Sequence, residues 1–339
     1  MSPPLPHFAP MEAKLVAALP EGPGWQFEPK WDGFRCLAYR AGGDVALMSK
    51  SGKPLGRYFP EIVELIRSLS AKRFVLDGEL IIPINDILSF EALQMRLHPA
   101  ESRVTKLSRE TPALFMAFDC LHHRDEALSG EALTIRRKAL EALITGERAS
   151  ALLLTPKTID VDEADAWLER SGGALDGVIA KRLNEPYRAG ERAMLKVKQT
   201  RTADCIVAGF RLASGSDAIG SLLLGLYNDQ GLIDHVGFTS AIKADERNAI
   251  AAKLKPFLGG TGFTGKAPGG LSRWSTDRSA QWTPLIPELV AEVRYDQVTA
   301  HRFRHGTSIA RWRPDKAPRQ CTMEQLQHEL RPAELATTF

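Results

Sequence analysis

The sequence predicts an α+β domain over residues 1–200, followed by a second domain of short strands over residues 201–339. Three observations lead to this prediction. The chain has 339 residues, which fits two domains when about 150 residues are allowed for each. Before residue 200, apolar strand patterns are mixed with separate amphipathic helix patterns. After residue 201, short apolar runs are separated by Gly, Asn and Asp turns, with one helical stretch among them.

The first domain begins with FEPKWDGFR (27–35), which predicts a charged strand that ends in an Asp-Gly turn at Gly33. Residues 58–69 predict an amphipathic helix, because Pro60 suits a first helical turn and apolar residues recur at helical spacing. Further strands are predicted at FVLDGELII (74–82), LFMAF (114–118), DGVIAKR (176–182) and AMLKVK (193–198), and further helices at 130–144 and 162–171.

The sequence pattern of the second domain is compatible with a small barrel such as the OB-fold, in which short strands alternate with tight turns. Its predicted strands are CIVAGFRL (205–212), GSLLLGLYN (220–228), LIDHVGFT (232–239) and LVAEVRYDQVT (289–299), and its helix is 242–255. The segment GTGFTGK (260–266) matches the first seven positions of a phosphate-binding P-loop. Ala267 follows where that loop needs Ser or Thr, and the preceding segment predicts a helix, so we expect a plain loop.

Composition narrows the classes of function. The charged fraction of 25% and hydrophobic fraction of 44% are those of a globular protein. No run approaches the ~18 apolar residues of a membrane helix, and the first residues lack the pattern of a secretion signal, so we expect a cytoplasmic protein. The four cysteines are scattered, which argues against a disulfide framework or a zinc site. A net charge of +3 leaves nucleic acid open, since a local basic face decides binding.

Five charged residues are embedded in segments that otherwise favour burial. They are Lys30, Glu79, Asp176, Lys196 and Lys198. A buried ion is costly unless it is matched by an opposite charge. Lys196 and Lys198 share one face of an extended strand, so their ammonium groups repel unless an acid or a phosphate lies over them. The sequence therefore predicts a charged site built from these strands.

These segments resemble the motifs of the covalent nucleotidyltransferases, which include the ATP-dependent DNA ligases and the mRNA capping enzymes. Six such motifs in the right order are stronger evidence for the resemblance than any one motif alone. The short N-terminal segment and the segments LVAEVRYD and FRH are most similar to the bacterial ligase C type, with the ligase domain of bacterial ligase D as a near relative. The resembling segments are KWDG for motif I, LDGEL for motif III, MAFD for motif IIIa, DGVIAK for motif IV, LKVK for motif V and RWRPDK for motif VI.

The resemblance implies a nucleotidyltransferase (adenylation) domain of antiparallel sheets with flanking helices over 1–200, and an OB-fold β-barrel over 201–339. It implies an ATP-dependent DNA ligase that seals nicks in duplex DNA during DNA repair, without reading the base sequence. Lys30 would attack the α-phosphorus of ATP and carry AMP. The AMP would pass to the 5′-phosphate of the nick, and the 3′-hydroxyl would then displace it.

The resemblance also assigns the residues that bind the nucleoside. It places Glu28 on the adenine, Phe118 stacked on the base and Glu79 on the ribose. Phe118 lies in an apolar run, so plain core packing is an equal alternative for it. Contacts to the sugar or the phosphates are implied for Arg35, Lys50 and Arg192, of which Arg192 has a loop charge as its alternative.

The phosphates and the metal are assigned in the same way. A divalent ion, Mg²⁺ or Mn²⁺, would be held by Asp176 and Glu79. Lys196 and Lys198 would disfavour the charged form of Lys30 and stabilise the triphosphate. The alternative for this lysine pair is a solvated strand edge. Two residues of the second domain would reach the departing pyrophosphate, namely Arg313 and Lys316.

Two positions depart from the family pattern. Motif IV usually carries Glu, whereas this chain has Asp176, which is shorter by one methylene. The Ser-Arg-x-Gly that usually follows motif I is here Ser49-Lys50-Ser51-Gly52. Lysine cannot make the bidentate contact of arginine. Both changes keep the sign of the charge, so we expect an active enzyme.

Rival functions stay open at this point. Within the same chemistry they are an RNA ligase and a guanylyltransferase of the mRNA-capping type, although the RxDK ending favours a DNA ligase. From another class, the chain would be an inactive OB-fold protein that binds nucleic acid. As a ligase it is expected to be a monomer of the bacterial nucleoid, with no membrane contact and with repair proteins as partners. The 29 residues before Lys30 are too few for an extra DNA-binding domain.

Overall fold

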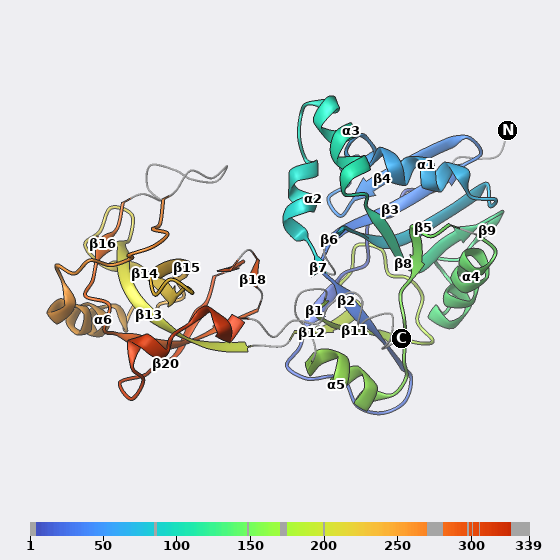
Figure 1. The fold of residues 1–339 in the computed structure, drawn as a ribbon. Helices are drawn as coiled ribbons and strands as arrows, with labels where there is room; N and C mark the ends of the chain where they lie inside the picture. Colours follow the sequence, from blue (N-terminus) through green and yellow to red (C-terminus); the bar gives the residue numbers. More distant parts are fainter. Residues whose placement is uncertain are drawn as a thin grey trace. The chain divides into compact units, whose positions relative to one another are not determined.

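The computed structural model describes residues 5–84, 87–147, 149–169, 175–198, 201–269, 281–296, 298–299, 301–304 and 306–326. The chain divides into two compact units, with the division between residues 199 and 200 (Figure 1). Each unit has a hydrophobic core of its own. The two are therefore described separately.

The first unit contains a four-stranded sheet in the order β1-β12-β11-β2. β11 pairs antiparallel with both β12 and β2, whereas the edge strand β1 runs parallel to β12. This arrangement places two of the charged segments on either side of a third. The strands are β1 (Ala13–Leu15), β2 (Trp25–Trp31), β11 (Leu175–Arg182) and β12 (Met194–Val197).

A larger sheet of the same unit has the order β10-β8-β5-β3-β4, with β9 paired to β8. Its pairs are antiparallel except for β10 with β8. Near one end, β6 (Pro83–Ile84) and β7 (Ile87–Leu88) form a separate hairpin. The strands of the large sheet are β3 (Phe34–Ala41), β4 (Asp44–Ser49), β5 (Arg73–Ile81), β8 (Leu114–His123), β9 (Glu126–Ala127) and β10 (Leu152–Leu154).

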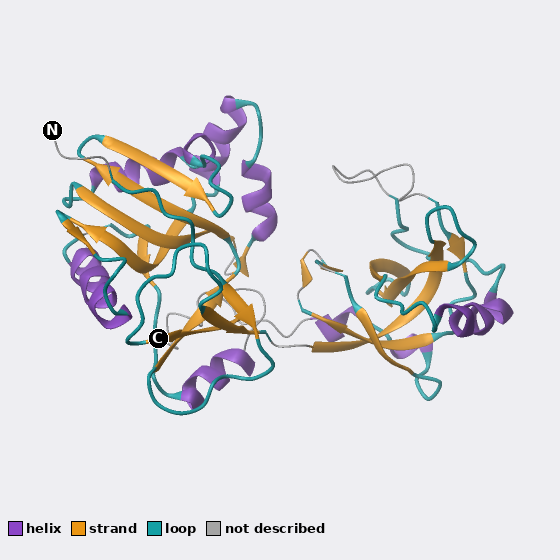
Figure 2. Cartoon of the chain, turned by 180° about the vertical axis from the view of Figure 1, so that it is seen from behind, coloured by secondary structure: helices purple, strands orange, loops and turns teal. Residues whose placement is uncertain are grey.

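Helices cover the outer faces of these sheets (Figures 1 and 2). α1 starts with Pro60 at its first position, where a missing N–H costs nothing, and it buries Ile62 and Ile66. These residues share one core with Leu140 and Leu143 of α4, so both helices pack on one face of the large sheet. α5 packs Trp167 against the four-stranded sheet. The helices are α1 (Pro60–Ser68), α2 (Phe90–Arg96), α3 (Glu101–Glu110), α4 (Leu133–Thr145) and α5 (Val161–Glu169), with the 3-10 turn η1 (Gly56–Tyr58).

The second unit is built mainly of strands, as the orange arrows of Figure 2 show. Its main sheet has the order β15-β14-β13-β17-β20, with β16 paired to β13. The expected barrel is not closed by a continuous ladder among the described residues. Within the described ranges, β15 meets the residue before β20 at an isolated bridge between Thr239 and Thr307, which is the partly open geometry of an OB-fold. The strands are β13 (Arg201–Leu212), β14 (Ile219–Tyr227), β15 (Ile233–Thr239), β16 (Thr283–Pro284), β17 (Val290–Tyr295) and β20 (Ser308–Trp312).

Smaller elements complete the second unit. α6 covers part of the predicted helix 242–255 and buries Ile250 and Leu254 in the core. The segment 260–266 contains no helix or strand, which confirms the expected loop. The remaining elements are α6 (Arg247–Leu254), η2 (Lys255–Phe257), β18 (Val298–Thr299), β19 (Arg302–Phe303), η3 (Pro318–Gln320) and η4 (Met323–Leu326).

The strands and helices predicted in the first unit are confirmed, although β8 continues to His123, five residues beyond the predicted LFMAF, and the end of the predicted helix 162–171 lies outside the described residues. The helices α2 and α3 were not predicted. α2 has Arg96 on its buried face, fully enclosed and paired with Glu61 at 2.6 Å. A charge on the buried face interrupts the apolar period from which helices are predicted. In α3 only Val104 is buried, so that helix has no apolar stripe.

Candidate functional site

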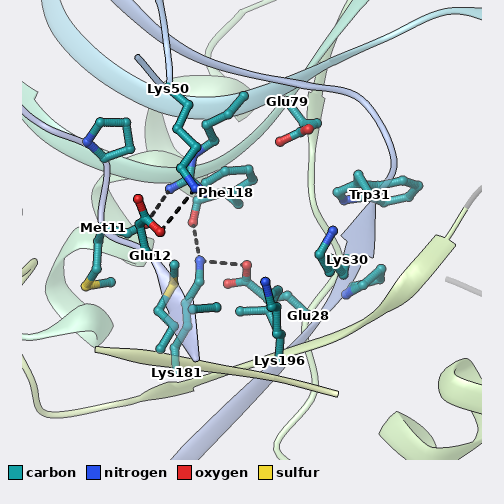
Figure 3. A pocket seen from close by; sticks show the side chains of 16 residues that line it. Met11, Glu12, Glu28, Lys30, Trp31, Lys50, Glu79, Phe118, Lys181 and Lys196 are labelled. Atoms are coloured by element: carbon teal, nitrogen blue, oxygen red, sulfur yellow. Dashed lines mark hydrogen bonds and ion pairs between the residues drawn. The ribbon is translucent and has the colours of Figure 1, made fainter. Parts of the chain in front are cut away.

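A cavity of about 220 Å³ lies within the first unit, and sixteen residues line it (Figure 3). Its walls come from both sheets, with β2, β11 and β12 on one side and β3, β5 and β8 on the other. The segment from Pro10 to Ala13 also contributes to the wall. Strands from distant parts of the sequence therefore bring the embedded charges to one place.

Lys30 lies in β2 and points into this cavity (Figure 3). Its Nζ is 2.5 Å from Oδ2 of Asp176, whose other oxygen, Oδ1, is 3.0 Å from Nζ of Lys198. Asp176 is buried, with 7% of its side chain exposed, while the two lysines are partly exposed. One buried carboxylate thus holds two ammonium groups, which compensates its own desolvation.

Strand register explains why these residues meet. In β11, Ile179 lies opposite Glu28 of β2 and opposite Lys196 of β12. β11 therefore stands between the strand of Lys30 and the strand of the two motif V lysines. The pairing with β2 also shifts between Leu175 and Val178, a bulge next to Asp176 that re-aims the strand.

Lys196 lines the same cavity and lies in a strongly positive environment. Its pKa is lowered from the usual lysine value, first by burial and then by the charges of Lys30 and Lys198. Asp176 opposes this shift. The site therefore disfavours additional positive charge and favours an anion.

Glu28 forms the centre of a buried network beside the cavity. Its Oε2 is 2.7 Å from Nζ of Lys181, and its Oε1 accepts a hydrogen bond of 2.7 Å from Nε2 of Gln26. Nη1 of Arg137 lies 3.9 Å from Oε1. Both Glu28 and Lys181 have less than a twentieth of their side chains exposed, at 3% and 4%. The carboxylate is consequently fixed in one orientation.

Phe118 lines the cavity with its ring between cationic groups. The guanidinium carbon of Arg35 lies 4.5 Å from the ring centroid, and Nζ of Lys181 lies 4.9 Å from it. Lys181 also donates to the backbone oxygen of Phe118 at 3.2 Å. Phe118 is half-buried, so its position combines wall packing with access to the cavity.

Arg35 is held by Asp77, which is fully buried. Its Nε and Nη2 donate to the two carboxylate oxygens at 2.5 and 2.6 Å, a bidentate pair. The hydroxyl of Tyr187 donates to the same carboxylate at 2.6 Å and accepts from the backbone N–H of Met11 at 2.8 Å. This network fixes the segment at residues 10–13 against the cavity.

Glu79 faces the cavity from β5 (Figure 3). Burial raises its pKa from 4.5 to about 7, although Arg35 and Lys30 act in the opposite direction. Near neutral pH this carboxyl therefore exists in both protonation states. A perturbed carboxyl in a cavity is typical of functional sites.

The outer edge of the site is lined by an exposed ionic group. Nζ of Lys50 is 3.1 Å from Oε2 of Glu12, and Lys50 lines the cavity. Nε of Arg192 is 3.9 Å from the same oxygen, but Arg192 is 76% exposed and does not line the cavity.

The second unit contains the two cations predicted for pyrophosphate. Nη1 of Arg313 lies 2.9 Å from Oδ1 of Asp204, and Nζ of Lys316 lies 3.4 Å from Oδ2. Asp315 also pairs with Arg313, at 2.8 Å. This cluster belongs to the second unit.

The structure brings most of the predicted residues together. Asp176 is linked to the cavity by its ion pair with Lys30, and Lys198 by its ion pair with Asp176. Arg192 stays at its rim, and Arg313 and Lys316 belong to the second unit. Seven predicted residues line the cavity, namely Glu28, Lys30, Arg35, Lys50, Glu79, Phe118 and Lys196.

Sequence reasoning missed Lys181, Asp77 and Glu12. Lys181 is the last residue of the motif IV segment DGVIAK. A lysine near the end of a strand is usually exposed, so the sequence did not indicate that Lys181 is buried. Asp77 lies two residues before Glu79 in the predicted strand FVLDGELII. The available signal was the same as for the predicted residues, a charge inside an apolar strand. Glu12 carries no such signal, because it precedes the strands of the motifs.

The described part of the chain has neither a metal-binding cluster of side chains nor a membrane-spanning helix. No group of three or more His, Cys, Asp or Glu side chains is arranged to hold a metal there. In the same residues, no helix is both long enough and apolar enough to span a bilayer. All four cysteines are buried and free.

Comparison with known proteins gives matches over almost the whole chain. A family model described as ATP dependent DNA ligase domain matches residues 8–198, and one described as ATP dependent DNA ligase C terminal region matches residues 215–316. DNA ligase C of Mycobacterium tuberculosis is 44% identical over 97% of this chain and 96% of its own length. DNA ligase C1 of Mycolicibacterium smegmatis is 44% identical over 95% and 94%.

More distant matches extend this pattern. The multifunctional non-homologous end joining DNA repair protein LigD of Mycobacterium tuberculosis is 32% identical over 94% of this chain, which corresponds to 40% of LigD. Among solved structures, a Lig E DNA ligase is 17% identical with a TM-score of 0.54, covering 89% of this chain and 100% of the other. At that identity the likeness supports the fold alone.

Proposed function

This chain belongs to the family of ATP-dependent DNA ligases, and on that premise we propose that Lys30 carries AMP while the enzyme seals nicks in duplex DNA. The observation that supports this role most directly is the convergence of Lys30, Lys196 and Lys198 around Asp176 at one cavity. A lysine nucleophile next to cations that attract phosphate is the arrangement that nucleotidyl transfer requires.

The chemistry of the first step follows from the lysine. An ordinary lysine with pKa ~10.4 is protonated at pH 7 and cannot attack. At the same cavity, burial and the charges of Lys30 and Lys198 lower the pKa of Lys196. Once Lys30 has lost its proton, its nitrogen forms a bond to the α-phosphorus of ATP. The bond from that phosphorus to the bridging oxygen breaks, and pyrophosphate leaves with the electron pair.

The nucleoside contacts are proposed for residues around the same cavity. Glu28 uses one lone pair of each oxygen for Lys181 and Gln26, so further lone pairs remain for the amino group of adenine. Phe118 stacks on the base, and Glu79 accepts from the ribose. Sugar and phosphate contacts are proposed for Arg35, Lys50 and Arg192.

A divalent metal, Mg²⁺ or Mn²⁺, fits this site as a partner of the substrate. Mg²⁺ is usually held by one or two carboxylates together with substrate phosphates and water, and needs no complete protein cage. Asp176 and Glu79 supply those carboxylates, and Asp176 would exchange its lysine partners for the ion. When bound, the ion supplies charge stabilisation for the triphosphate.

The remaining assignments concern the whole enzyme. We propose that residues 1–200 form the adenylation domain and residues 201–339 an OB-fold domain, in which Arg313 and Lys316 contact the departing pyrophosphate. The DNA is gripped through its backbone without sequence preference. We also propose a monomeric enzyme of the bacterial cytoplasm and nucleoid that acts in repair. The match to a relative named for end-joining DNA repair supports that role.

The test is the covalent adduct on Lys30. After mixing with ATP and Mg²⁺, the wild-type protein should gain the mass of one AMP, and Lys30→Ala should gain none. The exposed Lys14→Ala is the matched control and should load normally. Lys30→Ala should still seal a nick that already carries AMP, because only the first step needs the amine. Formation of the adduct by Lys30→Ala would show that the nucleophile is another residue.

The same assay separates the rival chemistries. A capping-type enzyme would take up GMP from GTP, and an RNA ligase would prefer nicks within RNA. We expect labelling from ATP and sealing of nicked DNA.

A further inference from the structure

Arg313 and Lys316 of the second unit converge on one carboxylate, that of Asp204. Nη1 of Arg313 donates to Oδ1 at 2.9 Å and to Oδ2 at 3.1 Å. Nζ of Lys316 is 3.4 Å from Oδ2. Asp204 lies far earlier in the chain, in β13, and only 12% of its side chain is exposed. Two cations with a proposed common task are therefore tied to one fixed point.

The backbone of Asp204 is fixed by two hydrogen bonds to the side chain of Gln325. Its N–H donates to Oε1 of Gln325 at 2.9 Å, and its carbonyl accepts from Nε2 of Gln325 at 3.2 Å. In the ladder it lies opposite Glu292 of β17, within the main sheet of the unit. A carboxylate mounted on a central strand is a rigid anchor for long, flexible cation side chains, which otherwise lose rotamer entropy on binding.

Asp315 also contacts Arg313, but in a different way. Its oxygens accept from Nε and Nη2 at 3.0 and 2.8 Å, and 63% of its side chain is exposed. It is only two residues away and sits on a turn, so solvent and anions have access to it. Asp204 instead engages Nη1 from the partly buried side. Removal of Asp204 would leave the orientation of Arg313 to an exposed neighbour.

We propose that Asp204 is a positioning residue for the first step, which holds Arg313 and Lys316 at a fixed spacing for the pyrophosphate of ATP. This inference rests on the proposed role of Arg313 and Lys316. Pre-oriented donors gain more from a developing charge than mobile ones, because no reorganisation is needed at the moment of reaction. Asp204 need not touch the substrate. Its carboxylate also compensates the repulsion between the two cations before ATP arrives.

The test compares Asp204→Asn with wild type in two separate reactions of the full-length protein. AMP loading from ATP should slow by roughly 10- to 100-fold, the scale of a small misplacement of a catalytic group. Sealing of a nick that already carries AMP should be unchanged, because no pyrophosphate leaves in that step. Asp229→Asn, an exposed turn residue of the same unit, is the matched control and should load normally. Thermal unfolding of each variant verifies that the fold is retained.

Two further variants distinguish positioning from a structural role. In an Arg313→Ala, Lys316→Ala background, Asp204→Asn should cause no additional loss, since nothing is left to position. A further loss in that background, or a parallel loss of sealing, would overturn the inference. If Asp204→Asn loads AMP normally while Arg313→Ala, Lys316→Ala loads poorly, the role of Asp204 is overturned, and the proposed pyrophosphate role of Arg313 and Lys316 stands. Normal loading by Arg313→Ala, Lys316→Ala would remove the proposed pyrophosphate role and the inference with it.

Discussion

Lys181 and Glu28 form a buried ion pair whose partners depend on each other. Replacement of Lys181 by Met would leave the Glu28 carboxylate enclosed, with Gln26 as its hydrogen-bond donor and Arg137 at 3.9 Å. Loss of one member of a buried pair typically costs about 3–5 kcal/mol. We expect Lys181→Met to lower the free energy of unfolding in urea by that amount.

The matching double variant tests the mechanism of that loss. Glu28→Gln combined with Lys181→Met removes both charges, so much of the stability should return while AMP loading stays defective. Strictly additive losses in a double-mutant cycle would show that the two charges do not compensate each other.

Glu79 gives a prediction about pH. Burial raises its pKa from 4.5 to about 7, so between these values the native protein keeps a proton that the unfolded chain has released. The contribution of Glu79 to stability therefore falls as pH rises from about 4.5 to about 7. Glu79→Gln removes this titration. The melting temperature of the variant minus that of the wild type should therefore be larger at pH 8 than at pH 5.

The same substitution, Glu79→Gln, should lower activity even at the pH where it raises stability. Glu79→Gln should load AMP poorly at every pH, because the ionised carboxylate is the proposed ribose and metal contact. Melting curves at pH 5 and pH 8 measure the effect on stability, and AMP loading measures the effect on activity. An equal shift in melting temperature at both pH values would contradict the raised pKa.

At the scale of elements, the Asp-Gly steps of the motif strands mark close backbone approaches. A Cβ added at Gly33 would lie 2.2 Å from the oxygen of Leu80, and one at Gly177 would lie 2.0 Å from the oxygen of Val197. Gly177 also has φ of +128°, a conformation that other residues rarely adopt. Gly177 lets β11 and β12 come close enough to bring Asp176 and Lys198 together, whereas Gly33 lets the turn after β2 approach β5.

Gly177→Ala should therefore separate β11 from β12. Backbone strain of this kind costs about 1–3 kcal/mol, and the clash with Val197 adds to it. We expect a lower melting temperature and a loss of AMP loading larger than the loss of stability explains. Gly130→Ala is the control, because an added Cβ there meets nothing within 4 Å. Normal loading by Gly177→Ala would show that the strand spacing is not needed.

The same elements show what the sequence could predict. Apolar periodicity predicted β5, β8, β11 and β12, and charges inside apolar strands indicated Lys30, Glu79 and Lys196 of the cavity. The other predicted cavity residues, Glu28, Arg35, Lys50 and Phe118, came from the family resemblance. Periodicity is local, so it could not predict that β11 lies between β2 and β12, or that Asp176 pairs with both Lys30 and Lys198. It also failed where burial is ionic, as at Arg96 of α2 and at Lys181, because a buried ion pair has no apolar signature.

At the scale of the whole molecule, the proposed machinery is divided between two units that each have a core. Lys30 and the nucleoside contacts belong to the first unit, and Arg313 and Lys316 belong to the second. The core of the first unit is built from residues before 200, so that unit has the packing to fold alone. If the second-unit cations are needed for AMP loading, the first unit by itself should be folded but inactive.

A chain that ends at residue 200 tests this division of labour. It should unfold cooperatively on heating, as the intact core requires, yet it should acquire no AMP from ATP and Mg²⁺. Loss of Arg313 and Lys316 is the physical reason, because the cavity cations alone would then have to stabilise the charge that develops on the leaving pyrophosphate. Full-length Arg313→Ala, Lys316→Ala is the matched comparison and should reproduce most of the defect. Normal loading by the folded, isolated first unit would show that the first step needs only the cavity residues, and that the second unit serves DNA binding instead.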